Sequence, residues 1–353
     1  MEHEKTRKLL IEHYHRYPRL QIRDVFKFIY QSSFGCEHMV SSSAAVTDYI
    51  RREAESCADQ AGPIDVLDGD YFRLHLCYLK QGLAAETLGK MFCASAKKEA
   101  EGLVALEQKL AVARQLTEHG ELPFGVDELD RAATEWRQQG YPAVHHSETF
   151  REYYKPAYRV IAKKHLPFLP ILAAIDRRAE RGTVTVALEG GSASGKTTLG
   201  QMLSELYDCT VFHMDDFFLR PEQRMPERFA EAGGNVDRER FLEQVLLPHS
   251  RGESVDYCRF DCSTFTICPP VRVTPKPITI VEGAYSMHPE LAPYYDLSVF
   301  LDIAPEAQKA RIERRNSPMM AQRFFNEWIP MEQRYFDQMQ VRARCDITIS
   351  INE

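Results

Sequence analysis

The chain has 353 residues, of which 44% are hydrophobic and 27% are charged, so it is long enough for two domains and is neither fibrous nor disordered. Its 51 acidic and 44 basic residues give a formal charge of -7, which argues against nucleic-acid binding and favours a small-molecule partner. No apolar run is long enough to cross a bilayer and no apolar signal core opens the chain, so we expect a cytoplasmic protein without a membrane segment.

The first half of the chain is expected to be mostly helical. Apolar residues recur there at helical spacing, as at Leu103, Leu106 and Leu110. We interpret the histidine pair His145–His146 as solvated rather than metal-binding. The surrounding segment 141–158 mixes aromatic and basic residues, and we expect it either to pack against the second half or to help form a ligand pocket there.

The character of the sequence changes near residue 180. Short β-branched runs then alternate with amphipathic segments, and the runs cover residues 183–189, 210–213, 278–282, 297–303 and 346–351. This alternation predicts βα units and a largely parallel sheet. We therefore predict a mostly helical domain of unknown role over residues 1–180 and an α/β domain over 181–353.

A glycine-rich motif follows the first of these strands. It matches the pattern G-x-x-x-x-G-K-[ST], and the segment consists of Gly190, Gly191, Ser192, Ala193, Ser194, Gly195, Lys196, Thr197 and Thr198. Glycines let main-chain amides close around phosphate oxygens at the start of a helix. Lys196 would add charge at the phosphates and the Thr197 hydroxyl could bind Mg²⁺, so the sequence predicts a nucleoside triphosphate site.

Two further predicted strands end in carboxylate side chains. The strand 210–213 leads into Asp215 and Asp216, either of which could accept a proton from an attacking alcohol or bind Mg²⁺ through water. Both could instead begin a turn. The strand 278–282 ends in Glu282, whose carboxylate is expected near Mg²⁺.

A basic cluster follows the strand 297–303. Arg311, Arg314 and Arg315 have helical spacing, and we expect their guanidinium groups to share one helical face. A transferring phosphoryl group is an anion that such a cluster could stabilise. The alternative is a solvated basic face that pairs with nearby glutamates.

In order and spacing, the segments GGSASGKTT, HMDDFF, IVEG and RIERR resemble the uridine kinase and phosphoribulokinase superfamily. HMDDFFLRP is especially similar to nicotinamide riboside kinases. The resemblance covers the chain from Thr183 to its end, and it implies a P-loop kinase fold with a five-stranded parallel sheet, ATP as donor and a small-molecule hydroxyl as acceptor. It also implies that Asp215 is the catalytic acid, Glu282 the carboxylate near Mg²⁺, and the arginine segment a lid helix.

The resemblance extends to positions expected to contact the acceptor. Asp237 matches an aspartate that binds ribose hydroxyls in uridine kinases, although it could equally be the N-cap of the following helix. Phe260 and Asp261 match a Y-D element, with phenylalanine where tyrosine is usual. Phe265 stands where family members have a histidine at the pyrimidine, and a phenyl ring cannot form those hydrogen bonds. Phosphoryl transfer is thus expected, but uridine and cytidine are not favoured as acceptors.

The sequence thus predicts an ATP- and Mg²⁺-dependent kinase that phosphorylates a hydroxyl of a small metabolite, such as a nucleoside or another riboside. The alternative is a nucleotide-dependent NTPase switch with the helical domain as its output module. Neither nucleic acid nor a membrane is an expected partner, and the sequence is compatible with an oligomer. It identifies neither the acceptor nor the role of residues 1–180.

Overall fold

The computed structural model divides the chain into two compact units, Met1–Leu169 and Pro170–Glu353. It describes residues 2–35, 43–55, 57, 62–95 and 102–351. The sequence-based boundary at 180 lies one helix later, because α8 (Leu169–Ala179) falls almost entirely within the second unit. Among the described residues, no helix combines the length and the apolarity that crossing a bilayer requires.

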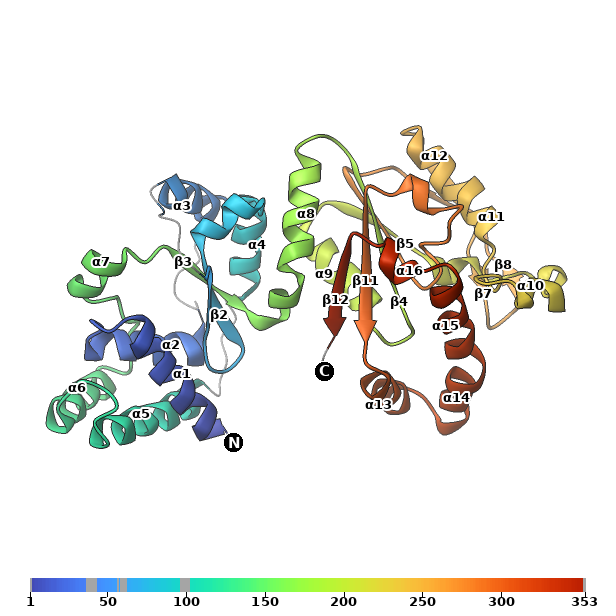
Figure 1. The fold of residues 1–353 in the computed structure, drawn as a ribbon. Helices are drawn as coiled ribbons and strands as arrows, with labels where there is room; N and C mark the ends of the chain where they lie inside the picture. The colour runs from blue at the N-terminus through green and yellow to red at the C-terminus, as the bar shows by residue number, and fades with distance from the viewer. Residues whose placement is uncertain (1, 36–42, 56, 58–61, 96–101, 352–353) are drawn as a thin grey trace. The chain divides into compact units, whose positions relative to one another are not determined.

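The first unit combines helices with a small sheet (Figure 1). Its helices are α1 (Glu2–Arg16), α2 (Ile22–Phe34), α3 (Ser43–Glu55), α4 (Ala85–Ser95), α5 (Gly102–Glu118), α6 (Val126–Gln138) and α7 (Glu148–Tyr154). Its antiparallel sheet has the order β1-β2-β3 and consists of β1 (Ile64–Val66), β2 (Tyr71–His75) and β3 (Tyr158–Ala162). The expected helices are present, whereas the sheet was not predicted, because all five residues of β2 are buried and show no alternation.

The second unit contains a five-stranded parallel sheet with the order β12-β11-β4-β10-β5. Its strands are β4 (Val184–Gly190), β5 (Cys209–His213), β10 (Ile278–Glu282), β11 (Leu297–Ile303) and β12 (Ile347–Ile351). These strands confirm all five predicted runs, as well as the predicted fold class. The central strand β4 is buried along its whole length, as expected for a parallel strand covered on both faces.

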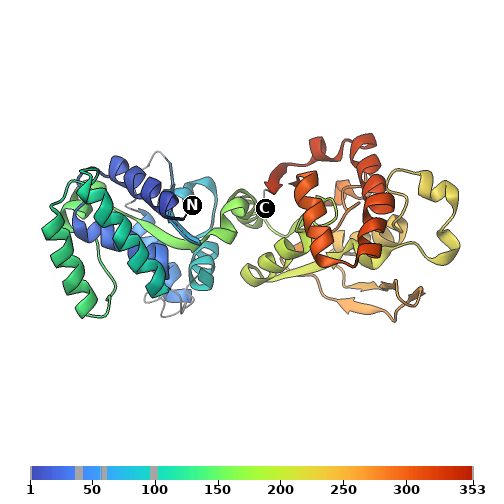
Figure 2. The ribbon, with the colours of Figure 1, turned by 90° about the horizontal axis from the view of Figure 1, so that it is seen from below.

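Helices and two small ribbons complete the second unit. The helices are α9 (Lys196–Leu206), α10 (Pro226–Ala230), α11 (Arg238–Phe241), α12 (Leu247–Ser250), α13 (Pro305–Arg315), α14 (Pro318–Arg323), α15 (Ile329–Gln338) and α16 (Val341–Arg344). Antiparallel pairs form between β6 (Val255–Tyr257) and β9 (Val271–Val273) and between β7 (Phe260–Asp261) and β8 (Thr266–Ile267). Figure 2 shows α13, α14 and α15 grouped together within this unit.

Helix α9 forms where the sequence places apolar residues at helical spacing. Leu199, Met202, Leu203 and Leu206 are all buried, and α9 packs against β4, β5 and β10. The loop before α9 is therefore fixed at the end of the central strand. The position of this loop determines where a ligand at the helix N-terminus would lie.

The start of the loop depends on a glycine for a steric reason. Gly190 has a φ of +146°, and a Cβ there would lie 2.5 Å from the Leu301 carbonyl oxygen of the neighbouring strand β11. Neither atom can move without breaking the sheet. Gly182 has nearly the same φ of +143°, but a Cβ there would meet no atom within 4 Å.

We predict that Gly190→Ala destabilises the second unit by about 3 kcal/mol or more, and Gly182→Ala by about 1–2 kcal/mol, because only the former adds a clash to the backbone strain. Urea unfolding followed by Trp328 fluorescence in a Trp136→Phe background measures this, since Trp328 lies in the second unit and Trp136 in the first. An equal loss of unfolding free energy in the two variants would contradict the proposed clash between a Cβ at position 190 and the Leu301 carbonyl oxygen.

Candidate functional site

Strand pairing brings the predicted functional segments to one edge of the sheet. β4 lies between β10 and β11, and β10 also pairs with β5. In the register, Glu282 is opposite His213 of β5 and Leu188 of β4. The loop after β4, Glu282 and the segment after β5 therefore meet at the carboxyl edge of the sheet, where open parallel sheets bind their ligands.

The glycine-rich loop has the backbone that an anion-binding turn needs. Ala193 and Gly195 have φ values of +61° and +100°, which turn successive amides toward the start of α9. Gly195 is the N-cap of α9 and offers no side chain to its first amides, so these donors remain suited to an anionic ligand. Thr198 is exposed in the first helical turn, so its side chain is accessible to a nucleotide at this end.

Lys196 lies across this loop. Its side chain is buried, and its ammonium group donates hydrogen bonds to the carbonyl oxygens of Gly190 at 2.8 Å and of Gly191 at 3.0 Å. The positive charge is thereby fixed beside the main-chain amides of the loop. This arrangement places a cation where a phosphate chain would need one.

Thr197 and Glu282 form a cluster of oxygen atoms beside the loop. The Thr197 hydroxyl donates to the two Glu282 carboxylate oxygens at 3.1 and 3.2 Å. The Glu282 carboxylate also lies 2.6 Å from Nδ1 of His213, and this hydrogen bond raises the pKa of His213. A hydroxyl and a carboxylate are hard oxygen ligands, so the residues present fit the Mg²⁺ that the sequence implies.

Asp215 and Asp216 face different groups, although they are adjacent in sequence. Burial raises the pKa of Asp215, and the charges nearest to it include Lys196, Glu282 and Arg315. Burial also raises the pKa of Asp216, and the charges that act on it include Arg259 and Arg240, while His213 acts on both carboxylates. Asp215 is thus the carboxylate on the side of the nucleotide loop.

The face of the arginine helix that meets the site carries Gln308 together with two of the three predicted arginines, Arg311 and Arg315. Gln308 donates to the Ser192 carbonyl oxygen at 2.9 Å, Arg311 donates to that of Ala193 at 3.2 Å, and the Arg315 charge acts on Asp215. No hydrogen bond or ion pair joins Arg314 to the loop within the described part of the chain. Gln308, Arg311 and Arg315 are three and four residues apart, so their side chains share one face of the helix.

Asp237 caps a helix in this structure. It is 1% exposed, and its carboxylate accepts hydrogen bonds from the Arg240 main-chain amide at 3.2 Å and from Arg240 Nε at 3.1 Å. The Arg220 guanidinium lies 3.6 Å away. Of the two interpretations left open by the sequence, this geometry favours the helix N-cap.

Phe260 and Asp261 lie on the β7–β8 ribbon. Phe260 is buried, and the Asp261 carboxylate accepts hydrogen bonds from the amide and the hydroxyl of Ser263, which fixes the turn. Phe265, at the tip, is 51% exposed and lies under the Arg224 guanidinium at 5.5 Å. The ribbon thus presents an aromatic ring with a cation, and no hydrogen-bonding side chain replaces the family's histidine at position 265.

Sequence reasoning missed two buried glutamates that bind the loop. Glu332 of α15 is 5% exposed, and its carboxylate accepts hydrogen bonds from the Ser192 amide at 2.9 Å and the Ser192 hydroxyl at 2.6 Å. Glu189 is fully buried and accepts from the Gly190 amide at 2.8 Å and the Tyr335 hydroxyl at 3.0 Å. Burial raises the pKa of Glu189 to about 7 and also raises that of Glu332.

Several known proteins are similar in sequence to part of this chain. A segment of 142 residues is 28% identical to the uridine kinase of Chloroflexus aurantiacus and 26% identical to uridine kinase-like protein 3 of Arabidopsis thaliana. These matches cover 38% and 37% of this chain, and they span 68% of the Chloroflexus protein and 30% of the Arabidopsis protein. No family model matches the chain.

Solved structures also match about half of this chain. A possible uridine kinase from Bacillus stearothermophilus is 22% identical with a TM-score of 0.39, and the match covers 51% of this chain and 98% of that one. A putative fructose transport system kinase from Silicibacter is 25% identical with a TM-score of 0.42, covering 50% and 94%. The chain is therefore similar in sequence to uridine kinases over part of its length, and its second unit has the glycine-rich loop and the five-stranded parallel sheet described above.

Proposed function

We propose that the second unit is a cytoplasmic kinase that transfers the γ-phosphoryl group of ATP to a hydroxyl of a small metabolite. One observation carries the proposal: the Asp215 carboxylate lies within electrostatic reach of Lys196, which lies across the nucleotide loop. Transfer to an alcohol needs a base beside the triphosphate, because the attacking hydroxyl must lose its proton. The relatives named uridine kinases support ribosides as the first acceptor class to test.

The proposed mechanism relies on positioning and charge. The loop amides and Lys196 would hold the phosphates, while Asp215 would orient the acceptor hydroxyl and take its proton. Thr197 and Glu282 would hold Mg²⁺, which supplies charge neutralisation on the phosphates when bound. Because the two side chains already contact each other, little rearrangement is needed to present both oxygens to a cation.

The arginine helix would stabilise the charge of the transferred group. Arg311 and Arg315 are the stronger candidates, because one binds the loop backbone and the other acts on Asp215. Arg314 is the weaker candidate, because no hydrogen bond or ion pair joins it to the loop within the described residues. We therefore propose unequal contributions from the three arginines.

The acceptor would bind near the segment after β5 and the β7–β8 ribbon. Asp237 could bind a ribose diol only by giving up part of its hydrogen bonding with Arg240, which makes it a weaker candidate than Asp215 for direct acceptor contact. Phe260 and Asp261 would instead shape the ribbon. An acceptor without a pyrimidine fits this arrangement better than uridine, because position 265 offers only an apolar ring.

An acceptor screen tests the proposal directly. The full chain is incubated with MgATP and pooled nucleosides, other ribosides, sugars and vitamins, and products are detected by the mass of one added phosphate. A product that depends on both ATP and one pooled compound is expected. Steady ATP hydrolysis that no compound accelerates would instead favour the NTPase switch, in which water is the acceptor.

We predict that Asp215→Asn lowers kcat by about 10²-fold or more while ATP binding is retained, because the amide cannot accept the hydroxyl proton. Asp216→Asn is the matched control, since its carboxylate faces Arg259 and Arg240, and it should retain most of the rate. Initial rates and ATP binding by calorimetry measure both. The reverse pattern would make Asp216 the catalytic acid.

The pH dependence of the rate gives an independent prediction. A base acts only when deprotonated, so kcat should fall as the pH drops through the Asp215 pKa, which lies above the ordinary value of 3.8 because burial raises it. The acid limb of the profile should disappear in the residual activity of Asp215→Asn. An unchanged acid limb in that variant would assign the titration to another group.

Glu332 provides a test of the electrostatics of the loop. Its carboxylate accepts a hydrogen bond from the Ser192 amide and places a negative charge near Lys196. We predict that Glu332→Gln lowers KM for ATP about three- to tenfold, because the charge is removed while an acceptor oxygen remains. Glu327→Gln, an exposed glutamate paired with Arg323, is the control and should leave KM unchanged. A higher KM in Glu332→Gln would mean that the carboxylate is needed to hold the loop in its binding shape.

A further inference from the structure

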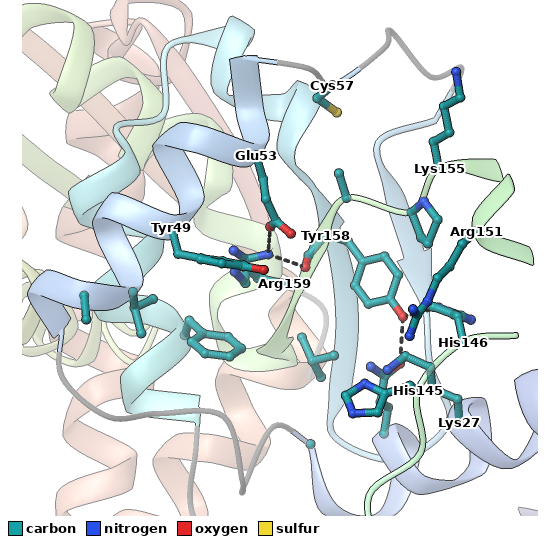
Figure 3. Close-up of a pocket in the computed structure, with 18 residues that line it drawn as sticks. Lys27, Tyr49, Glu53, Cys57, His145, His146, Arg151, Lys155, Tyr158 and Arg159 are labelled. Atoms are coloured by element: carbon teal, nitrogen blue, oxygen red, sulfur yellow. Dashed lines mark hydrogen bonds and ion pairs between the residues drawn. The ribbon is translucent and has the colours of Figure 1, made fainter. Parts of the chain in front are cut away.

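The first unit contains a large cavity that the proposed kinase reaction does not use. Its volume is about 1010 Å³, and it is lined by α2, α3, α7, the segment before α7 and β3 (Figure 3). This volume lies at the upper end of the range for sites that enclose a small molecule. All the residues that line it belong to the first unit, so the cavity is formed by this unit alone.

The lining carries an excess of positive charge. Lys27, Arg151, Lys155 and Arg159 line the cavity, whereas Glu53 is the single carboxylate among the described residues that do so. Glu53 is paired with Arg159 at 2.7 Å, so it does not compensate the other three cations. Cations gathered in one hollow repel one another unless an anion joins them.

Two of these cations converge on one wall. Figure 3 shows the Arg151 side chain running toward His146 and the Tyr158 hydroxyl. Within the described part of the chain, no hydrogen bond or ion pair occupies the Arg151 guanidinium group. The Lys27 ammonium donates one hydrogen bond to the Val144 carbonyl oxygen at 2.9 Å. Burial and the charges of Arg73, Arg151 and Arg23 lower its pKa to about 8, and the Asp24 carboxylate opposes them in part.

A buried arginine behind this wall adds to the positive potential. Arg73 of β2 is completely buried, and its Nε donates to Gln31, a lining residue, at 2.8 Å. Its two terminal nitrogens have no hydrogen-bond partner, and its guanidinium lies 4.8 Å from the ring centre of Tyr158. The Arg73 charge acts on the buried Asp65 carboxylate, its register partner on β1, but no described group accepts a hydrogen bond from its terminal nitrogens, and an anion in the adjacent cavity would add to this compensation.

The polar groups of the wall are held in place by a buried network. Nδ1 of His146 lies 2.9 Å from the Asp24 carboxylate, and Nε2 lies 2.6 Å from the Tyr158 hydroxyl. Asp24 also accepts hydrogen bonds from the amide and the hydroxyl of Ser147, and the His146 ring stacks on Phe150. These contacts fix the wall before any ligand arrives, as a built binding site requires. They also correct our prediction for this histidine pair, because His146 is buried whereas His145 is exposed.

We propose that this cavity is a binding site for a small organic anion, whose phosphate or carboxylate group is bound by Lys27 and Arg151 beside His146 and Tyr158. Arg73 adds long-range attraction, and Tyr49 and Phe92 supply apolar surface for the rest of the ligand. The segment 141–158 lines this cavity of the first unit, whereas from the sequence we expected it at the second half of the chain. This inference does not depend on the proposed kinase activity.

Calorimetry on the full chain tests this site, with Lys196→Ala as the background so that the nucleotide loop contributes little. Glucose 6-phosphate and inorganic phosphate represent the phosphate class, and citrate represents the carboxylate class. At least one probe should bind, and adding Arg151→Ala should weaken it about tenfold or more, the effect of losing one strong charge-assisted hydrogen bond. Arg131→Ala on α6, an exposed arginine outside the cavity, is the matched control and should leave affinity unchanged.

Proton uptake provides a second readout that a loss of packing would not reproduce. Because the pKa of Lys27 is about 8, anion binding at pH 8 should draw a proton onto this amine, which is measured by titration in buffers of different ionisation enthalpy. Lys27→Met should abolish the uptake, while circular dichroism checks that the variant folds. Binding of no probe more tightly than about 10 mM, or unchanged affinity in Arg151→Ala, would overturn the proposal.

Discussion

The proposed chemistry depends on the parallel pairing of β4, β10 and β5. This pairing is what brings a main-chain anion cradle, the Glu282 carboxylate and the segment that carries Asp215 to one edge of the sheet. None of these groups is near another in sequence. A shift of one residue in the register of β10 would turn Glu282 to the opposite face of the sheet and away from Thr197.

The site balances opposite charges at short range. The charges of Lys196, His213 and Arg315 lower the pKa of Asp215, and the charge of Glu282 raises it. The cations favour the charged form of Asp215 and the neighbouring carboxylate opposes it, while burial raises the pKa further. A raised pKa suits Asp215 as the proposed base, because a carboxylate with a higher pKa accepts the proton of the acceptor hydroxyl more readily. A carboxylate whose charged form is strongly stabilised would be a poor proton acceptor.

The sequence predicted the parts of the site that are local. The glycine-rich loop, the strand before it and the helix after it fall within a single continuous segment, so their spacing alone identified them. Glu332 could not be found in this way, because its contact with Ser192 joins residues far apart in the chain and belongs to no motif. Gln308 was missed because helical spacing gives the faces of a helix but not the face that meets the loop.

The two anion sites of the chain would rely on different donors. Main-chain amides dominate the loop before α9, and the amides themselves carry no titrating charge. The cavity of the first unit relies on side-chain cations, and Lys27 loses its charge above a pH of about 8. Because the deprotonated amine no longer attracts an anion, affinity in the cavity should fall as the pH rises past this value, while the amides of the loop continue to donate. The pH dependence of affinity therefore separates a ligand held mainly by main-chain amides from one held by side-chain cations, of which Lys27 loses its charge first.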